Sequence, residues 1–180
     1  MARLRGHEMT PNPYFFPIML WLHFLCGIMW IGLLYYFNFV NAAAVKEATA
    51  AGEAGPIGKY IMPRALLFFR WAAVLTWLIG AGLLSTFTAP NGMNGFPAAF
   101  LLQGYLAPIG IGAWLGTIML INVWTLIWMN QKKILGIVPA TDEQKVKARR
   151  VAFLASRVNT MLSIPMLFFM ATGPHNNIYH

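Results

Sequence analysis

The chain has 180 residues, of which 58% are hydrophobic and only 10% are charged. Soluble domains are about 45–50% apolar, so this composition indicates a membrane protein and argues against a water-soluble domain. The net charge of +8 does not indicate a nucleic-acid partner. The basic residues lie between apolar segments, where membrane orientation and binding to anionic lipid explain them better.

A transmembrane helix needs about 20 mostly apolar residues. Four segments meet this requirement, so we predict an all-α bundle of four transmembrane helices. Residues 1–180 then form a single polytopic membrane domain in the lipid bilayer, because the length suits one domain. The predicted spans are approximately 17–40, 65–87, 107–129 and 151–170.

The connections between the spans differ in character. Residues 88–104 are rich in Pro, Gly and Asn, which predicts a loop. Thr141 is followed by Asp142, Glu143 and Gln144, which predicts that Thr141 is the N-cap of a helix running into the fourth span.

The charge of the connections predicts the orientation. Lys and Arg gather in the connections after the first and third spans, whereas the second connection has none. The positive-inside rule places the two basic connections in the cytoplasm. Arg3 and Arg5 oppose this assignment but are outnumbered. We therefore expect a multi-pass protein of the bacterial inner (cytoplasmic) membrane with both termini outside.

The first and third spans share a pattern. Trp30, Gly32 and Asn38 in the first have the same spacing as Trp114, Gly116 and Asn122 in the third. Each of these spans is followed by one with an arginine near its predicted cytoplasmic start. The pattern suggests a parallel 2+2 repeat of helix hairpins, unless it is a coincidence among Trp- and Gly-rich helices. The nearby glycines of the third span, at positions 110, 112 and 116, predict tight packing.

His23 is the only histidine inside a predicted span, and it lies roughly 10 Å below the predicted outer end of that span. An ionisable residue at that depth is costly and by default marks a functional site. It can ligate a haem iron, relay protons or bind substrate, or it can simply hydrogen-bond a neighbouring helix. Met166, Met170, His175 and His7 are possible second ligands. No CxxCH motif is present, so we expect no covalently bound haem.

A second set of polar residues lies in the predicted inner half: Arg70, Asn122, Arg157 and Asn159. No predicted span contains Asp or Glu, so the two arginines have no carboxylate partner there. They are candidates for binding an anion such as a haem propionate, a lipid phosphate or an anionic substrate. The alternative is that each arginine reaches the nearby interface and has no ligand. Pro165 predicts a kink in the fourth span.

Several stretches together carry a family resemblance: 21–41, 68–84, 115–134 and 156–170, which include Asn122-Val123-Trp124 and Asn130-Gln131-Lys132-Lys133. They resemble the membrane domain of cytochrome-linked urate hydroxylases of the PuuD type, the urate oxidase N-terminal family. The first span is also similar to HemJ-type protoporphyrinogen oxidases, a resemblance that implies haem ligation by His23. Within these 180 residues no cytochrome c domain follows, and Val158 stands where the family has a histidine.

Three functions follow from these observations. The first is a membrane redox protein that binds b-type haem through His23 and passes electrons to a partner cytochrome or oxidase. The second is a non-catalytic subunit of a respiratory or photosynthetic complex. The third, implied by the resemblance, is a urate-hydroxylase-like oxidase that uses a separate cytochrome. Under the first, Arg70, Arg157, Asn122 and Asn159 are candidate residues for holding the cofactor, with His23 as the iron ligand.

Overall fold

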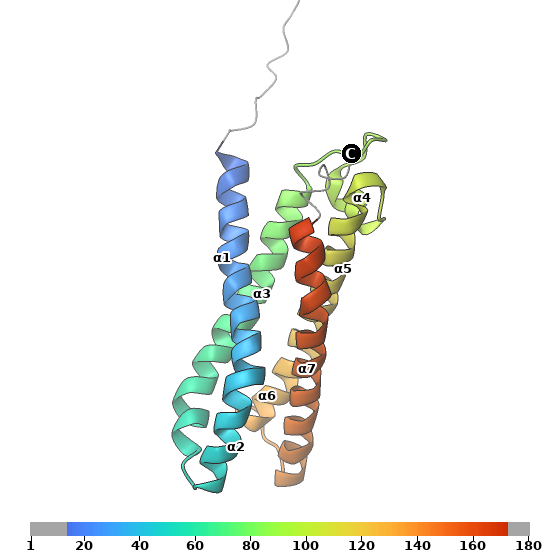
Figure 1. Ribbon diagram of the computed structural model, residues 1–180. Helices are drawn as coiled ribbons and strands as arrows, with labels where there is room; N and C mark the ends of the chain where they lie inside the picture. Colours follow the sequence, from blue (N-terminus) through green and yellow to red (C-terminus); the bar gives the residue numbers. More distant parts are fainter. Residues whose placement is uncertain (1–13, 173–180) are drawn as a thin grey trace, which may run out of the picture.

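The fold comes from a computed structural model of the chain, in which residues 14–172 are described. Within that range four long helical segments alternate in direction along one bundle axis (Figure 1). They comprise Phe15–Ala50, Ile57–Leu84, Gly104–Ile134 and Asp142–Thr172, and each is long and apolar enough to cross a membrane. The prediction of an all-α, multi-pass membrane bundle is confirmed.

Three of the four segments contain short non-α turns. The first consists of α1 (Phe15–Tyr35), the π-helical turn η1 (Tyr36–Asn41) and α2 (Ala42–Ala50). The second consists of η2 (Ile57–Ile61) and α3 (Met62–Leu84). The third consists of η3 (Gly104–Leu106), α5 (Ala107–Asn122), η4 (Val123–Ile127) and α6 (Trp128–Ile134). The fourth is the single helix α7 (Asp142–Thr172), which continues through Pro165.

The end of the second span differs from the prediction. We predicted that it runs to Phe87, but α3 ends at Leu84. The hydroxyl groups of Ser85 and Thr86 donate to the carbonyl oxygens of Ala81 and Leu83, at 2.9 and 2.7 Å. The backbone N–H groups of Thr86 and Phe87 bond three residues back, to the carbonyl oxygens of Leu83 and Leu84, so the α-helical pattern ends here although Phe87 is apolar.

The second connection was predicted to be a loop, and it contains one short helix, α4 (Gly95–Phe100). Asn94 caps this helix, because its Oδ1 accepts from the backbone N–H of Phe96 at 3.0 Å. The helix packs on α5, where Gly110 lies so close to the carbonyl group of Ala99 that no Cβ would fit. The prediction of tight packing at the glycines of the third span is thus confirmed at Gly110.

The start of α7 matches the prediction. Thr141 Oγ1 accepts from the backbone N–H of Gln144 at 3.2 Å, and Gln144 Oε1 accepts from the backbone N–H of Thr141 at 3.0 Å. This reciprocal pair is a capping box, which satisfies two backbone donors at once.

The bundle is built from two hairpins, because α1 packs chiefly on α3 and α5 packs chiefly on α7. Both hairpins have a π-helical turn near the asparagine of the repeated pattern, but in different registers: Asn38 lies within η1, whereas Asn122 directly precedes η4. The side chains are less symmetric. Trp30 is 3% exposed in the core, whereas its counterpart Trp114 is 46% exposed. The parallel 2+2 repeat of helix hairpins therefore stays a prediction.

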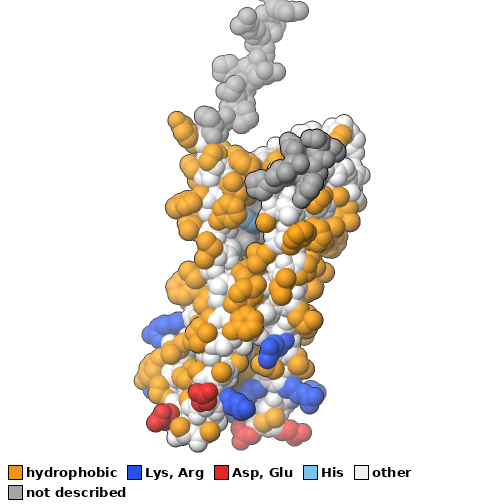
Figure 2. Space-filling model, in the orientation of Figure 1, with side chains coloured by type: hydrophobic (Ala, Val, Ile, Leu, Met, Phe, Trp, Pro, Cys, Tyr) orange, Lys and Arg blue, Asp and Glu red, His pale blue; other side chains and the backbone are white. Residues whose placement is uncertain are grey.

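The surface has an apolar belt and one charged end. Figure 2 shows hydrophobic side chains along most of the bundle, with Lys, Arg, Asp and Glu gathered at the end where α2 and the start of α7 lie. The first and last described helical turns lie at the opposite end (Figure 1). The two basic connections therefore lie together at one end of the bundle, as alternating helix directions require.

Candidate functional site

His23 lies half-buried on α1 and faces α3. Its Nδ1 is 3.0 Å from the carbonyl oxygen of Thr76. A carbonyl oxygen can only accept, so Nδ1 carries the proton and donates it. The neutral ring then has its lone pair on Nε2. Metal-binding histidines commonly donate the other ring N–H to a carbonyl group in this way.

Gly80 makes room for this ring. A Cβ added at Gly80 would lie 2.9 Å from His23 Cε1 and 3.3 Å from Nδ1. Real Cβ atoms do not approach other atoms this closely, so a side chain at position 80 would displace the imidazole. Nε2 makes no hydrogen bond to any of residues 14–172. His23 is thus oriented by α3 and keeps one ring nitrogen available.

The structure does not place the predicted second haem ligands around His23. Met166 is 5% exposed and belongs to the main core cluster, and Met170 packs at Gly112, 3.3 Å from where a Cβ would be. His7 and His175 lie outside the described residues. Within residues 14–172 no group of three or more His, Cys, Asp or Glu side chains is arranged to hold a metal ion.

Arg70 lies between the two hairpins. Its guanidinium carbon is 3.7 Å from the centre of the Trp128 ring on α6, a short cation–π contact. No hydrogen bond joins Arg70 to another side chain within the described part of the chain. The face of the guanidinium is therefore covered while its N–H donors stay available for an anion.

Arg157 lies elsewhere. It is exposed on α7, and its guanidinium carbon is 5.0 Å from the centre of the Phe153 ring on the same helix. The structure therefore does not bring Arg70 and Arg157 together. The exposed position of Arg157 agrees with the alternative in which a basic side chain reaches toward the interface.

Asn122 and Asn159 do meet. Asn122 Nδ2 donates to Asn159 Oδ1 at 2.6 Å and to the carbonyl oxygen of Ala155 at 2.9 Å. Asn159, which is fully buried, donates to the carbonyl oxygen of Met119 at 3.1 Å. These bonds connect α5 to α7 in the apolar core. They use most of the hydrogen-bonding capacity of the pair, although Asn122 Oδ1 has no partner among the described residues.

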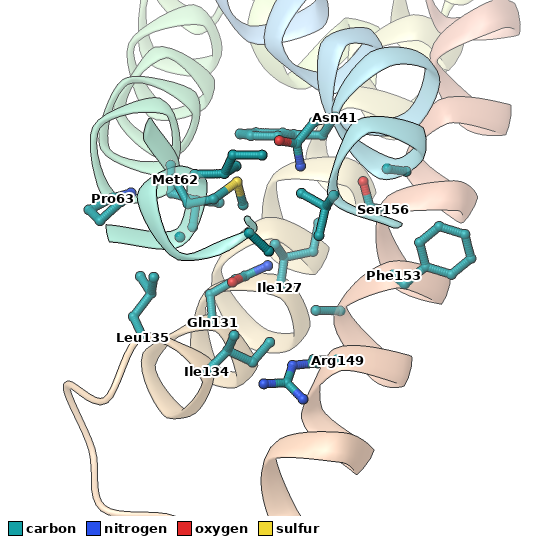
Figure 3. A pocket seen from close by; sticks show the side chains of 18 of the residues that line it. Asn41, Met62, Pro63, Ile127, Gln131, Ile134, Leu135, Arg149, Phe153 and Ser156 are labelled. Atoms are coloured by element: carbon teal, nitrogen blue, oxygen red, sulfur yellow. The ribbon is translucent and has the colours of Figure 1, made fainter. Parts of the chain in front are cut away.

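A cavity of about 1020 Å³ lies at the charged end of the bundle. We call it the interface cavity. All four helical segments line it, and Figure 3 shows Asn41, Gln131, Ser156 and Arg149 around it among apolar side chains. Lys59 and Arg149 are its lining cations, and no Asp or Glu lines it within residues 14–172.

The sequence analysis did not group the residues of the interface cavity into one site. Asn38 stood out through the repeat, but Asn41, Gln131 and Arg149 lie outside the predicted spans and resemble ordinary polar residues of the connections. Asn38 Nδ2 donates to Ser156 Oγ at 2.7 Å and to the carbonyl oxygen of Leu34 at 2.8 Å. The position of Asn38 in the repeated sequence pattern was the only signal in the sequence that pointed to this cavity.

Fold and sites together define a four-helix, multi-pass membrane protein with an oriented histidine inside the first helix pair and a basic cavity at its charged end. Compared with known families, residues 92–180 match the family model described as urate oxidase N-terminal. This match confirms the resemblance to the urate oxidase N-terminal family, and it covers just under half of the chain, the part that contains α5 and α7. Searches of curated proteins and of solved structures found no match.

Proposed function

We propose that the protein is a membrane redox protein that binds a b-type haem through His23 and passes electrons to a partner cytochrome or oxidase. The observation that carries this proposal is the orientation of His23. Its Nδ1–H donates to the Thr76 carbonyl oxygen, and its Nε2 has no partner within the described residues.

In this proposal each residue has a separate task. Thr76 holds the tautomer in which Nε2 is the electron-pair donor. Arg70, with its N–H donors available, is better suited to a propionate than the outward-facing Arg157. The Asn122 and Asn159 amides hold α5 against α7 through their hydrogen bonds, so they are not assigned to the cofactor. When bound, the haem would supply one-electron transfer.

A visible spectrum of the purified protein tests this function. We expect a Soret band in the wild type that is lost in His23→Ala, because no other described histidine is available to replace it. Arg157→Ala is the matched control and should keep the band. A stably folded protein without haem, or a His23→Ala variant with an unchanged spectrum, would overturn the proposal.

A second candidate is a urate-hydroxylase-like oxidase, which the family match at residues 92–180 supports. Urate consumption by the purified protein, with an added cytochrome as electron acceptor, tests it. We expect turnover that disappears in His23→Ala if both proposals hold. If a haem-loaded protein consumes no urate with any acceptor, the urate oxidase candidate is wrong and only the electron-transfer proposal is left.

We also propose that the charged end faces the cytoplasm, in a bacterial inner membrane, with both termini outside. The clustering of Lys and Arg at that end supports this orientation (Figure 2). Single cysteines placed at Glu53 and at Asn91, with Cys26 replaced by Ser, test it in intact cells. A membrane-impermeant maleimide should label position 91 only, and labelling of position 53 alone would reverse the orientation.

A further inference from the structure

The interface cavity lies at the depth where the predicted spans end. Its lining includes residues on both sides of those limits, such as Asn38 and Asn41 around the end of the first span at residue 40. On the other helices, Ile127 and Gln131 flank the end of the third span, and Arg149 and Ala152 flank the start of the fourth. In a bilayer this is the level of the lipid headgroups.

The cavity is basic. Arg149 and Lys59 line it, and neither forms an ion pair with any described residue. Lys59 lies 5.1 Å from the centre of the Tyr60 ring, which leaves its ammonium group available. With no carboxylate in the lining, the nearest fixed charges favour an anion.

The inner part of the cavity has polar groups without partners. Asn41 is only 8% exposed, and its side-chain amide makes no hydrogen bond within residues 14–172. Figure 3 shows this amide pointing into the cavity, with the Gln131 amide below it. Gln131 likewise has no side-chain partner among the described residues. An amide has both donor and acceptor atoms, so these two groups favour a ligand that both donates and accepts hydrogen bonds.

The remaining wall is apolar. Leu66 and Phe69 of α3 and Ile127 of η4 line it, and each is almost fully buried. Phe153 on α7 also lines the cavity but is 44% exposed, so the cavity reaches the outer surface of α7. The cavity thus joins a basic, hydrogen-bonding region to an apolar one at the edge of the bundle, which is the amphipathic pattern of a phospholipid.

We propose that the interface cavity binds one anionic phospholipid that has a hydroxyl-bearing headgroup. The phosphate binds Arg149 and Lys59, the headgroup hydroxyls bond to the Asn41 and Gln131 amides, and the acyl chains leave past Phe153. In the proposed orientation the cavity opens in the cytoplasmic leaflet, where anionic lipids attract basic residues. This site is separate from His23, and its occupancy does not depend on the redox function.

Native mass spectrometry of the full-length protein in mild detergent tests the proposal. The probes are phosphatidylglycerol and phosphatidylcholine with identical acyl chains, and glycerol 3-phosphate as the soluble alternative. We expect one retained phosphatidylglycerol, bound about fivefold or more tightly than phosphatidylcholine, because each basic contact near the headgroups contributes about 1 kcal/mol. Arg149→Gln should remove this preference, and the neighbouring Arg150→Gln, which does not line the cavity, should keep it.

Asn41→Leu tests the amide contact, and it should also lower retention of phosphatidylglycerol. If the Asn41→Leu variant does not fold, Arg149→Gln still tests the proposal, because Arg149 is exposed and its replacement should leave the fold intact. Equal retention of both lipids, or equal behaviour of the Arg149 and Arg150 variants, would overturn the proposal. Displacement of the lipid by equimolar glycerol 3-phosphate would also overturn it in favour of a soluble phosphate. His23→Ala should leave lipid binding unchanged, which separates this result from the haem test.

Discussion

His23 on α1 and Thr76 on α3 form a hydrogen bond across the first hairpin, with 3.0 Å between Nδ1 and the carbonyl oxygen. One turn further along α3, Gly80 lies against the same ring. Two features of α3 therefore orient the His23 ring inside the bundle: the carbonyl acceptor of Thr76, and the space left by the absence of a side chain at Gly80.

Gly80→Ala should displace the His23 ring, because the new Cβ would lie 2.9 Å from Cε1. We expect haem content to fall severalfold, although alanine favours a helix over glycine by about 1 kcal/mol. Absorbance at the Soret band per mole of protein measures the effect. Gly82→Ala on the same helix is the control, because its Cβ would meet only the flexible end of Met19 at 3.3 Å. Equal haem content in both variants would contradict the assigned role of Gly80.

Asn159→Leu should destabilise the second hairpin. It removes the acceptor of Asn122 Nδ2 and the donor to the Met119 carbonyl oxygen, both in the buried core. Buried polar contacts between membrane helices contribute about 0.6 kcal/mol each, with values up to about 1.7, so we expect a loss of about 1 kcal/mol. Thermal unfolding in detergent measures it. Asn130→Ala removes only a bond to the Leu126 carbonyl oxygen of its own helix and should have a smaller effect.

Arg70→Gln should weaken the contact between the two hairpins. The guanidinium stacks on Trp128 at 3.7 Å, and cation–π contacts contribute about 0.5–2 kcal/mol according to their desolvation. We expect a loss of about 1 kcal/mol in the free energy of unfolding. Arg157→Gln should change it by less than half as much, since Arg157 is exposed and contacts its own helix. The reverse order would show that Arg157 has a partner outside the described residues.

Gly110→Ala should destabilise the fold through overpacking, by about 1–3 kcal/mol, because the Ala99 carbonyl group occupies the space of the new Cβ. Gly116→Ala should be neutral or stabilising, since nothing lies within 4 Å of its Cβ position. Both variants make the same Gly→Ala change within α5, so their unfolding temperatures can be compared directly. A destabilised Gly116→Ala variant would contradict the packing described for α5.

Tyr35→Phe should lower stability by about 0.5–1.5 kcal/mol. The Tyr35 hydroxyl is 3.0 Å from Ser163 Oγ, which donates its own proton to the Thr160 carbonyl oxygen at 2.7 Å, so Tyr35 is the donor. This bond joins α1 to α7 across the hairpins. Tyr36→Phe is the control, because the Tyr36 hydroxyl makes no hydrogen bond to a described residue. Chemical unfolding of both variants in one detergent tests the difference.

The sequence predicted the helices well because their signals are local. About 20 apolar residues in a row identify a membrane helix at any position. The Thr141–Gln144 capping box is equally local, and the structure confirms it. The predicted span extended past Leu84 because Phe87 is apolar, whereas the backbone bonds of Thr86 and Phe87 change to the carbonyl groups three residues back.

The sequence by itself thus determined the four membrane helices, the capping of α7 and the presence of a histidine in the first span, since each depends on neighbouring residues. Only the tertiary structure decided which polar residues face each other. Asn122 meets Asn159, Arg157 turns outward, and Asn41 and Gln131 point into one cavity with Arg149. The physical reason is helix rotation: each residue turns the side chain by about 100° around the axis, so a partner is set by packing between helices and not by spacing along the chain.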